Sequence, residues 1–456
     1  MFNKVLIANR GEIALRIIST CRRMGIRTVA VYSEADSDAL HVKEADESCF
    51  IGEASPAMSY LRIDKILDAT KEKGCEAIHP GYGFLSENAE FASKCLNSGI
   101  TFIGPSAEAI RLMGEKHKAK SVMEKAGVPV VPGYFGEEQS KQCLLKEADK
   151  IGYPLMVKAV LGGGGKGMRV VQKKEDFGAA LASVENEARN AFGDSRVMLE
   201  CFVKKPRHIE FQVLGDHHGN IVHLFERDCS VQRRHQKIIE ESPSLFFDNK
   251  IREQMADAAV IAAKTVEYTG AGTVEFIVGD DSSFYFMEMN TRLQVEHPVT
   301  EMITGLDLVE LQLRIAAGEK LNLTQSKINK SGHAIEARIY AENPATGFLP
   351  STGELQKIAI PETVQLEKAP SQEADELSSS SLRIDTGVEE GDHISINYDP
   401  LISKMIVHAD TRKNAIKAMR NALEQTAVIG VDTNLSFLQS IFLDGDFEES
   451  QQDTLF

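Results

Sequence analysis

The sequence predicts a mixed α/β and α+β protein built in three consecutive parts. Over residues 1–112, short apolar runs alternate with helical patterns, which is typical of βαβ units and a parallel sheet. Over residues 113–330, strand-like runs follow one another directly, which favours an antiparallel sheet flanked by helices. A third part, with further strands and a helix, is expected over residues 331–447.

The first part opens on KVLIA at residues 4–8, a buried-strand pattern that is too short for a secretory leader, so the chain is expected to start within its fold. A helical pattern then continues through Met24. Further strands are expected at 27–33 and 46–52 and within 76–88 and 101–106, with helices near 61–73 and up to about 97.

The second and third parts contain more strands. Helices are expected near 115–126, 176–192, 248–268 and 306–317, with strands at 154–161, 168–172, 197–203, 208–215, 220–227, 272–278 and 284–290. The last part shows strand patterns at 333–342, 357–360, 394–400 (ISINYDP) and 403–409, and a helix at 411–426. Residues 371–381 (SQEADELSSSS) are a polar, low-complexity stretch, which predicts a mobile loop.

Composition excludes several classes of protein. The 456 residues are 43% hydrophobic and 26% charged, which is ordinary globular usage and argues against disordered, collagen-like or coiled-coil chains. A net charge of −16 repels polyanions, so nucleic acid and membrane surfaces are not expected partners, although a local phosphate site remains compatible. Seven scattered cysteines without a C-x-x-C motif indicate reduced thiols in an intracellular protein, expected to be cytoplasmic, or in the mitochondrial matrix if a transit peptide has been removed.

A glycine run joins two of the predicted strands. Residues 162–167 (GGGGKG) fit G-x-G-x-x-G, but a strand follows where a dinucleotide-binding motif needs a helix. Lys166 is followed by Gly167 instead of Ser or Thr, so the P-loop pattern fails as well. Two interpretations remain: a flexible hairpin whose backbone N–H groups close over phosphates, or a turn without a ligand.

Basic residues mark two candidate anion sites. Lys158 lies within the apolar run PLMVKAV, and a buried ammonium group needs an anionic partner such as a phosphate. Lys116 is a second candidate for the same role, although a lone lysine is usually a surface charge. The segment RDCSVQRRHQK (227–237) concentrates further donors in one loop, whose alternative interpretation is a solvated loop.

The strongest signal is a polar stripe at 288–296. If this segment is extended, its alternate residues share one face: Glu288, Asn290, Arg292, Gln294 and Glu296. Carboxylate and amide oxygens suit Mg²⁺, which also binds substrate phosphates. Glu275 can join Glu288 if the hairpin between them places residue 275 opposite 286, which requires either an even-length loop such as Asp280-Asp281 or a bulge. The alternative is an edge strand that carries a ladder of charges.

These motifs together resemble the biotin carboxylase family, the ATP-grasp component of biotin-dependent carboxylases. The resemblance rests on IANRGEIALRI (7–17), HPGYGFLSEN (79–88), GGGGKGM (162–168), RDCSVQRRHQK (227–237) and EMNTRLQVEHPVTEMITG (288–305), and it runs from residue 2 to about 447. Within the family, residues 33–48, 136–144 and 215–220 and the VEFIV segment resemble the alpha subunits of 3-methylcrotonyl-CoA carboxylases. Biotin carboxylase components of acetyl-CoA, propionyl-CoA or pyruvate carboxylases remain the alternative.

The resemblance implies a pre-ATP-grasp domain (1–112), an ATP-grasp domain (113–330) with a mobile lid at about 130–203, and a biotin carboxylase C-terminal domain (331–447). It assigns ATP binding to Lys116, Lys158, Gly163, Gly164, Gly165, Glu200, His208, Gln232 and His235. It assigns Mg²⁺ or Mn²⁺ to Glu275, Glu288 and Asn290, and the positioning of bicarbonate to Lys237, Arg292, Gln294 and Val295. Glu296 is implied to deprotonate bicarbonate, and Arg338 to stabilise the biotin enolate.

The resemblance also implies partners. No biotin-accepting Met-Lys-Met segment occurs, and SKMIV (403–407) lacks the required order, so biotin is expected on another chain or on a C-terminal region absent from this sequence. A biotin carboxyl carrier domain, a carboxyltransferase (beta) subunit and an oligomeric complete enzyme are expected. Two rival functions are a different ATP-grasp ligase that joins a carboxylate to an amine and a nucleotide-binding scaffold without catalysis.

Overall fold

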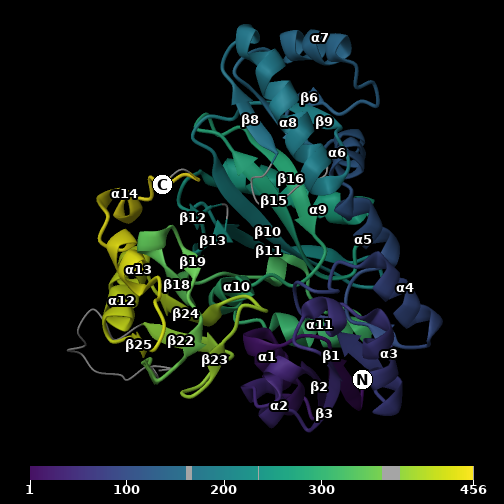
Figure 1. Cartoon of the computed structure of the whole chain (residues 1–456), viewed down its shortest axis with the longest axis vertical. Coiled ribbons are helices and arrows are strands. Elements are labelled where there is room, and N and C mark those ends of the chain that lie inside the picture. The colour runs from purple at the N-terminus through teal and green to yellow at the C-terminus, as the bar shows by residue number, and fades with distance from the viewer. Residues whose placement is uncertain (161–166, 235, 362–379, 455) are drawn as a thin grey trace.

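The computed structural model describes residues 1–160, 167–234, 236–361, 380–454 and 456. Three main sheets organise these residues: a parallel sheet near the N-terminus, a small antiparallel sheet at the far end of the molecule, and a long antiparallel sheet between them and the C-terminal helices (Figure 1). The expected mixture of α/β and α+β architecture is confirmed. Among the described residues no helix combines the length and the apolar character needed to cross a bilayer.

The N-terminal sheet is parallel, with strand order β3-β2-β1-β4-β5, as the alternating pattern predicts. Val5, Leu6 and Ile7 of β1 are fully buried because helices cover the sheet. Its strands are β1 (Lys4–Ile7), β2 (Arg27–Ser33), β3 (Glu47–Gly52), β4 (Ala77–His79) and β5 (Thr101–Phe102). Its helices are α1 (Gly11–Arg23), α2 (Leu40–Glu44), α3 (Ile63–Glu72), α4 (Ala89–Asn97) and α5 (Ala107–Gly114).

The small antiparallel sheet has the order β6-β9-β7-β8 and lies at the top of Figure 1 with α7 and α8. The glycine run between β7 and β8 falls outside the described residues except for Gly167, so the expected phosphate-covering hairpin stays a prediction. In chain order, the helices and strands of residues 116–201 are α6 (Lys116–Lys125), β6 (Gly133–Tyr134), α7 (Lys141–Ile151), β7 (Leu155–Ala159), β8 (Met168–Val171), α8 (Phe177–Phe192) and β9 (Val197–Cys201).

The long sheet has eight antiparallel strands in the order β16-β15-β10-β11-β14-β17-β24-β22. It crosses the expected boundary near residue 330, because β14 pairs with β17 and places Glu240 opposite Glu336. The strands are β10 (Arg207–Gly215), β11 (Ile221–Asp228), β14 (Ile239–Ser242), β15 (Gly270–Val278), β16 (Phe284–Asn290), β17 (His333–Tyr340), β22 (Ser381–Thr386) and β24 (Leu401–Ala409). Residues of the second and third parts therefore share one continuous hydrogen-bonded frame.

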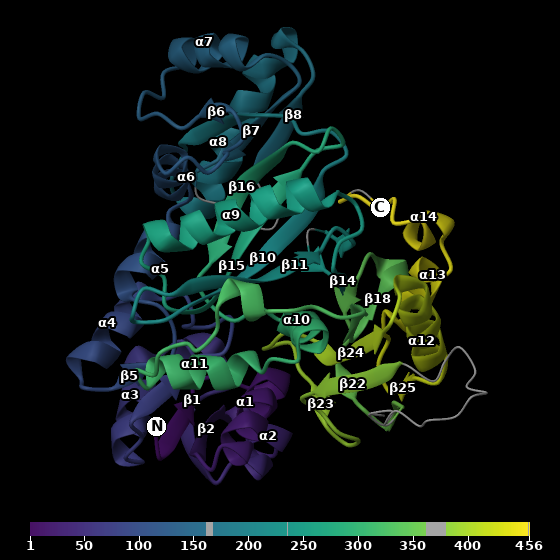
Figure 2. The ribbon, with the colours of Figure 1, turned by 180° about the vertical axis from the view of Figure 1, so that it is seen from behind.

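Helices cover this sheet along its length. Helix α9 packs on β10, β11 and β15, and α12 packs on β17 and β24 (Figure 2). The helices are α9 (Asn249–Thr265), α10 (His297–Thr304), α11 (Leu308–Ala316), α12 (Arg412–Glu424), α13 (Leu435–Ile441) and α14 (Gly445–Glu448). Short strands are β12 (Gln232–Arg233), β13 (Gln236–Lys237), β18 (Glu342–Asn343), β19 (Leu349–Pro350), β20 (Gly353–Glu354), β21 (Lys357–Ala359), β23 (His393–Ile394) and β25 (Ala427–Ile429).

One expected strand is wrong. Of the segment 394–400, only Ile394 belongs to a strand, β23, and the chain then turns. The Asp399 carboxylate accepts the Leu401 backbone N–H at 3.0 Å, and Pro400 has no N–H to donate to a ladder. Turn chemistry therefore overrides the alternating pattern of ISINYDP. Most of the polar stretch 371–381 lies outside the described residues, so its expected mobility stays a prediction.

Candidate active site

A cleft of about 310 Å³ lies between the small antiparallel sheet and the long sheet. Methionines from β7, β8, β9 and β16 line part of its wall, and polar side chains line the rest. The cleft brings together eight of the residues expected from the sequence: Lys116, Lys158, Glu200, His208, Gln232, Lys237, Glu275 and Glu288. His235 and Gly163 to Gly165 lie outside the described residues.

One end of the cleft is basic. Glu200, 1% exposed, forms ion pairs with both Lys120 and Lys158, so one carboxylate is shared by two ammonium groups. Burial, together with Lys116 and Lys158, lowers the pKa of Lys120 to about 7, and burial lowers the pKa of Lys158 to about 8. An anion bound here would relieve this crowding of positive charge. Sequence reasoning missed Lys120, although it lies four residues after Lys116 and hence on the same helix face.

Next to this end, three carboxylates lie side by side on neighbouring strands. Glu210 of β10 pairs with Glu275 of β15, and Glu275 pairs with Glu288 of β16. A β-bulge after Glu275 produces this register, since Phe286 pairs with Phe276. The expected pairing of residue 275 with 286 is therefore wrong, because residue 275 pairs with 288, two residues further along the chain. A bulge is present, as one form of the expected hairpin required, and it brings Glu275 opposite Glu288.

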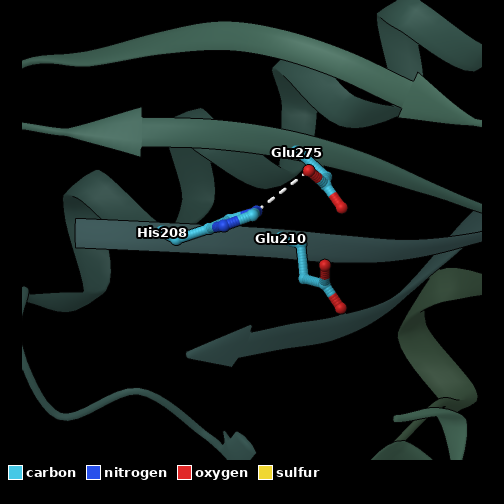
Figure 3. Close-up of side chains that lie close together, drawn as sticks. All are labelled: His208, Glu210 and Glu275. Carbon is cyan, nitrogen blue, oxygen red and sulfur yellow. Dashed lines mark hydrogen bonds and ion pairs between the residues drawn. The ribbon is translucent and has the colours of Figure 1, made fainter. Parts of the chain in front are cut away.

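Cations partly neutralise this row of carboxylates. Lys237 Nζ lies 2.5 Å from Glu210 Oε2 and 2.9 Å from Glu275 Oε1, while Lys116 Nζ lies 3.0 Å from Glu288 Oε2. Figure 3 shows His208 beside Glu275, with 2.9 Å between Nε2 and Oε2, and Glu210 close to both. Although burial opposes its ionisation, Lys237 and His208 hold the pKa of Glu275 well below its usual range.

The polar stripe is less regular than the sequence predicts. Strand β16 ends at Asn290, and the chain then turns until α10 begins after Glu296, so the expected extended conformation of 291–296 is wrong. The Pro at the second position of α10 favours this helix start. The side chains nevertheless converge, because Asn290 and Gln294 both donate to Glu275 Oε1, at 2.7 Å and 3.2 Å.

Arg292 organises the outer side of this turn. Its Nε donates to Glu87 Oε2 at 2.9 Å, and its Nη1 donates to Gln294 Oε1 at 3.3 Å. The exposed Glu87 also accepts the Thr291 backbone N–H at 3.0 Å, so it holds the start of the turn as well. Sequence reasoning missed Glu87 as a site residue, because nothing in the local pattern connects it with a segment about 200 residues away.

The inner side of the turn carries Glu296, which is fully buried between two cations. Its Oε1 accepts from Lys237 Nζ at 2.7 Å and its Oε2 accepts from Arg338 Nη2 at 2.9 Å. Although burial opposes its ionisation, Lys237 and Arg338 hold the pKa of Glu296 well below its usual range. Glu296 is therefore an ionised carboxylate with a fixed orientation, beside the row of carboxylates and joined to it by Lys237.

Arg338 faces further carboxylates that the sequence analysis did not identify. Glu240 forms an ion pair with Arg338, and Glu336 of β17 lies opposite Glu240. Neither carboxylate oxygen of Glu336 has a hydrogen-bond partner among the residues that the structure describes. Burial raises the pKa of Glu240 to about 7, although Arg338 opposes the shift. Burial, with Glu240 nearby, also raises the pKa of Glu336 well above its usual range, although Lys404 opposes the shift.

Some of the missed residues left a signal in the sequence. Glu210 and Gln212 alternate with His208 on β10, so a polar face could have been recognised there as it was at 288–296. Glu336 alternates with Arg338 on β17 in the same way, whereas Glu240 left no such signal because its strand, β14, has only four residues.

Three family models match successive parts of the chain. The biotin carboxylase N-terminal domain matches residues 1–110, the carbamoyl-phosphate synthase L chain ATP binding domain matches residues 115–324, and the biotin carboxylase C-terminal domain matches residues 336–456.

Curated relatives match over the whole chain. A biotin carboxylase of Halalkalibacterium halodurans is 50% identical, over 100% of this chain and 97% of that protein. The mitochondrial methylcrotonoyl-CoA carboxylase subunit alpha of Dictyostelium discoideum is 53% identical, over 99% of this chain and 63% of that subunit. The corresponding subunit of Rattus norvegicus is 54% identical, over 99% of this chain and 61% of that subunit. This chain thus spans less than two thirds of the length of these subunits.

Solved structures share the fold. The structure of a biotin carboxylase–beta-gamma-ATP complex from Campylobacter jejuni matches with a TM-score of 0.92 and 45% identity, over 100% of this chain and 98% of that chain. The biotin carboxylase domain dimer of Hydrogenobacter thermophilus 2-oxoglutarate carboxylase, in complex with MgADP, ADP and bicarbonate, matches with a TM-score of 0.91 and 46% identity over 100% of this chain and 96% of that chain.

Proposed function

Because this chain belongs to the biotin carboxylase family, we propose that it uses ATP and bicarbonate to carboxylate biotin through carboxyphosphate. One observation carries the proposal: Glu296, an ionised and fully buried carboxylate, is held between Lys237 and Arg338. A general base needs this fixed orientation, and an anionic substrate needs the two cations.

The basic end of the cleft is the proposed site for the phosphates of ATP. Lys116 and Lys158 would hold the phosphates, and Gly163 to Gly165 would close over them. Lys120 joins this proposal, because it shares Glu200 with Lys158 and so contributes to the same excess of positive charge. Glu200, His208, Gln232 and His235 are proposed to contact the rest of the nucleotide.

The carboxylate row is the proposed metal site. Glu275, Glu288 and Asn290 supply carboxylate and amide oxygens, which fit Mg²⁺ or Mn²⁺. A bound divalent ion would neutralise charge on the phosphates of ATP. Glu288 fits this role because its side chain is a third exposed at the cleft and pairs with Lys116, itself a proposed phosphate ligand.

The turn at 291–296 is the proposed bicarbonate site, with Lys237, Arg292, Gln294 and the Val295 backbone around the anion. Glu296 would take the proton of bicarbonate, whose oxygen then attacks the γ-phosphoryl group of ATP. Phosphoryl transfer needs chiefly positioning and charge neutralisation, which Lys237 supplies 2.7 Å from Glu296. The mixed anhydride then decomposes to CO₂ and phosphate inside the cleft, where the lid would exclude water.

Biotin is the third substrate of this reaction, after ATP and bicarbonate. Biotin N1′ would lose its proton to the phosphate released with CO₂ and then form the N–C bond to that CO₂. Arg338, 6% exposed and close to Glu296, is proposed to stabilise the negative charge that develops on biotin in this step. We propose that a biotin carboxyl carrier domain delivers this biotin and that a carboxyltransferase subunit uses the product. The 53% identity with a methylcrotonoyl-CoA carboxylase subunit alpha favours 3-methylcrotonyl-CoA as final acceptor, and acetyl-CoA, propionyl-CoA or pyruvate are alternatives.

The proposal is tested with the purified chain, MgATP, bicarbonate and free biotin. We expect phosphate release that requires bicarbonate and carboxybiotin formation that requires all three substrates. ATP cleavage stimulated by an amine and indifferent to bicarbonate would instead support a different ATP-grasp ligase, and nucleotide binding without cleavage would support a scaffold. Purification from the native source, followed by identification of the biotinylated chain that accompanies this one, tests the partner and the acyl-CoA.

A further inference from the structure

A lysine that none of the proposed steps uses lies beneath the catalytic turn. Lys404 of β24 is fully buried, and its Nζ donates to the Val295 carbonyl at 2.8 Å. Its nearest carboxylates are more distant, with Glu12 Oε1 at 3.2 Å and Asp385 Oδ2 at 3.7 Å. The closest partner of this buried cation is therefore a backbone oxygen between the proposed bicarbonate ligand Gln294 and the proposed base Glu296.

The position of Lys404 in the fold restricts the movement of its hydrogen bond to the Val295 carbonyl. In the long sheet it pairs with Arg338 of β17 on one side and with Asp385 of β22 on the other. Glu12, its nearest ion-pair partner, belongs to helix α1 of the N-terminal part. Lys404 thus connects the centre of the sheet, the first helix and the turn.

Lys404 is also the lysine of SKMIV (403–407), which lacks the order of a biotin-accepting motif. A lysine that carries biotin has to reach a ligating enzyme and then a distant site, whereas Lys404 has no exposed surface and is held by three oxygen atoms. Burying an ammonium group is costly, so its position calls for a structural reason.

We propose that Lys404 is a positioning residue for bicarbonate, which fixes the Val295–Glu296 peptide and with it the turn 291–296. In a planar trans peptide the carbonyl and the following N–H point in opposite directions, so holding the Val295 carbonyl also sets the direction of the Glu296 N–H. The same contact fixes the backbone from which the Glu296 side chain reaches Lys237 and Arg338. This inference rests on the proposed function of the turn.

The test compares variants of the full chain. Lys404→Met removes the contact with Val295, and Lys404→Arg keeps a donor and a charge. Glu12→Gln is the matched control, since it removes the nearest ion-pair partner and leaves the carbonyl contact in place. The double variant Glu12→Gln/Lys404→Met removes the lysine without leaving Glu12 unpaired, so it provides the measurement if Lys404→Met alone does not fold.

Two readouts separate positioning from general destabilisation. In bicarbonate-dependent ATP cleavage, Lys404→Met and the double variant should raise the KM for bicarbonate about tenfold or more, because a charge-assisted hydrogen bond is lost. The KM for ATP should change less than about twofold, Glu12→Gln should leave both constants near wild type, and Lys404→Arg should fall between. Hydrogen exchange of the amides at 291–297 should be faster in both Met variants and unchanged in Glu12→Gln.

The outcomes are distinguishable from failure of the proposed function. If the wild-type chain cleaves no ATP in response to bicarbonate, the proposed function is wrong, and hydrogen exchange alone decides whether Lys404 holds the turn. If the wild type is active and the two Met variants keep the wild-type KM for bicarbonate, the role of Lys404 is refuted. A rise of equal size in the Glu12→Gln control would also refute it, because ion pairing would then explain the effect.

Discussion

Glu296 and Arg338 are in direct contact, yet their replacement should impair the reaction in different ways. Glu296→Gln keeps the size of the side chain and removes the base. Loss of a general base typically costs about 10²–10⁴-fold, or roughly 3–5 kcal/mol in the activation free energy. The structure adds a second cost: Glu296 accepts from Lys237 through one oxygen and from Arg338 through the other, and an amide has only one oxygen. Bicarbonate-dependent ATP cleavage and carboxybiotin formation should therefore fall together.

Arg338→Ala should behave differently, because the proposed role of Arg338 follows cleavage of ATP. Lys237 still faces Glu296 in this variant, and Arg227 also favours its ionised form, so the base stays ionised. We expect much of the bicarbonate-dependent phosphate release to remain while carboxybiotin is lost. Removing Arg338 also leaves Glu240 buried without its ion-pair partner, which destabilises the fold.

Arg412→Ala controls for that destabilisation. Arg412 is 7% exposed and pairs with the buried Glu241, the residue after Glu240 on β14. Its hydrogen bonds within the described part of the chain go to Glu241 and the Glu448 carbonyl, which both lie outside the proposed site. The assay measures phosphate released and carboxybiotin formed in each variant, and Arg412→Ala should keep the wild-type ratio. The assignment of roles is wrong if Glu296→Gln is the uncoupled variant, or if Arg338→Ala keeps the wild-type ratio of phosphate to carboxybiotin.

Three further predictions concern stability, the lid and the acyl-CoA. The raised pKa of Glu336 means that the folded state holds a proton that the unfolded chain releases near pH 4.3, so stability falls as pH rises from about 4.3 to the folded pKa. Glu336→Gln cannot release this proton, so its stability should not fall in this way. The denaturant midpoint of the variant minus that of the wild type should therefore increase from pH 5 to pH 8. A difference between the two midpoints that does not change with pH would contradict the reasoning. Amides of β7 and β9 should exchange more slowly once MgATP is bound, whereas those of β1 should not change, and equal protection with and without nucleotide would count against a lid. With free biotin, the chain alone should form carboxybiotin slowly and transfer no carboxyl group to 3-methylcrotonyl-CoA, and a carboxylated acyl-CoA detected by mass spectrometry would disprove this.

Several expectations stay predictions. They concern the domain boundaries, the roles of individual site residues, the oligomeric assembly and the cellular compartment. Gly163 to Gly165 and His235 join them, because the structure does not describe these residues.

The sequence by itself determined the fold class, the family and most of the charged and polar residues that line the cleft. Strand and helix periods are local properties, so the alternation in residues 1–112 was enough to predict a parallel sheet. Long motifs in fixed order were enough to indicate the family. The chemistry of the polar stripe is also local, and two of its members, Asn290 and Gln294, converge on Glu275 even though the backbone turns after Asn290.

Only the tertiary structure decided which distant groups meet. The bulge that aligns Glu275 with Glu288 depends on pairing between two strands, and a shift of one residue there would turn a side chain to the other face. Lys404 reaches Val295 across 109 positions of the chain, and Glu240 meets Glu336 across two strands that are buried throughout. Local residue patterns carry no information about such partners, because long-range packing of the sheets selects them. The sequence therefore supplies the charged residues of this site, and the folded core decides which of them lie next to one another.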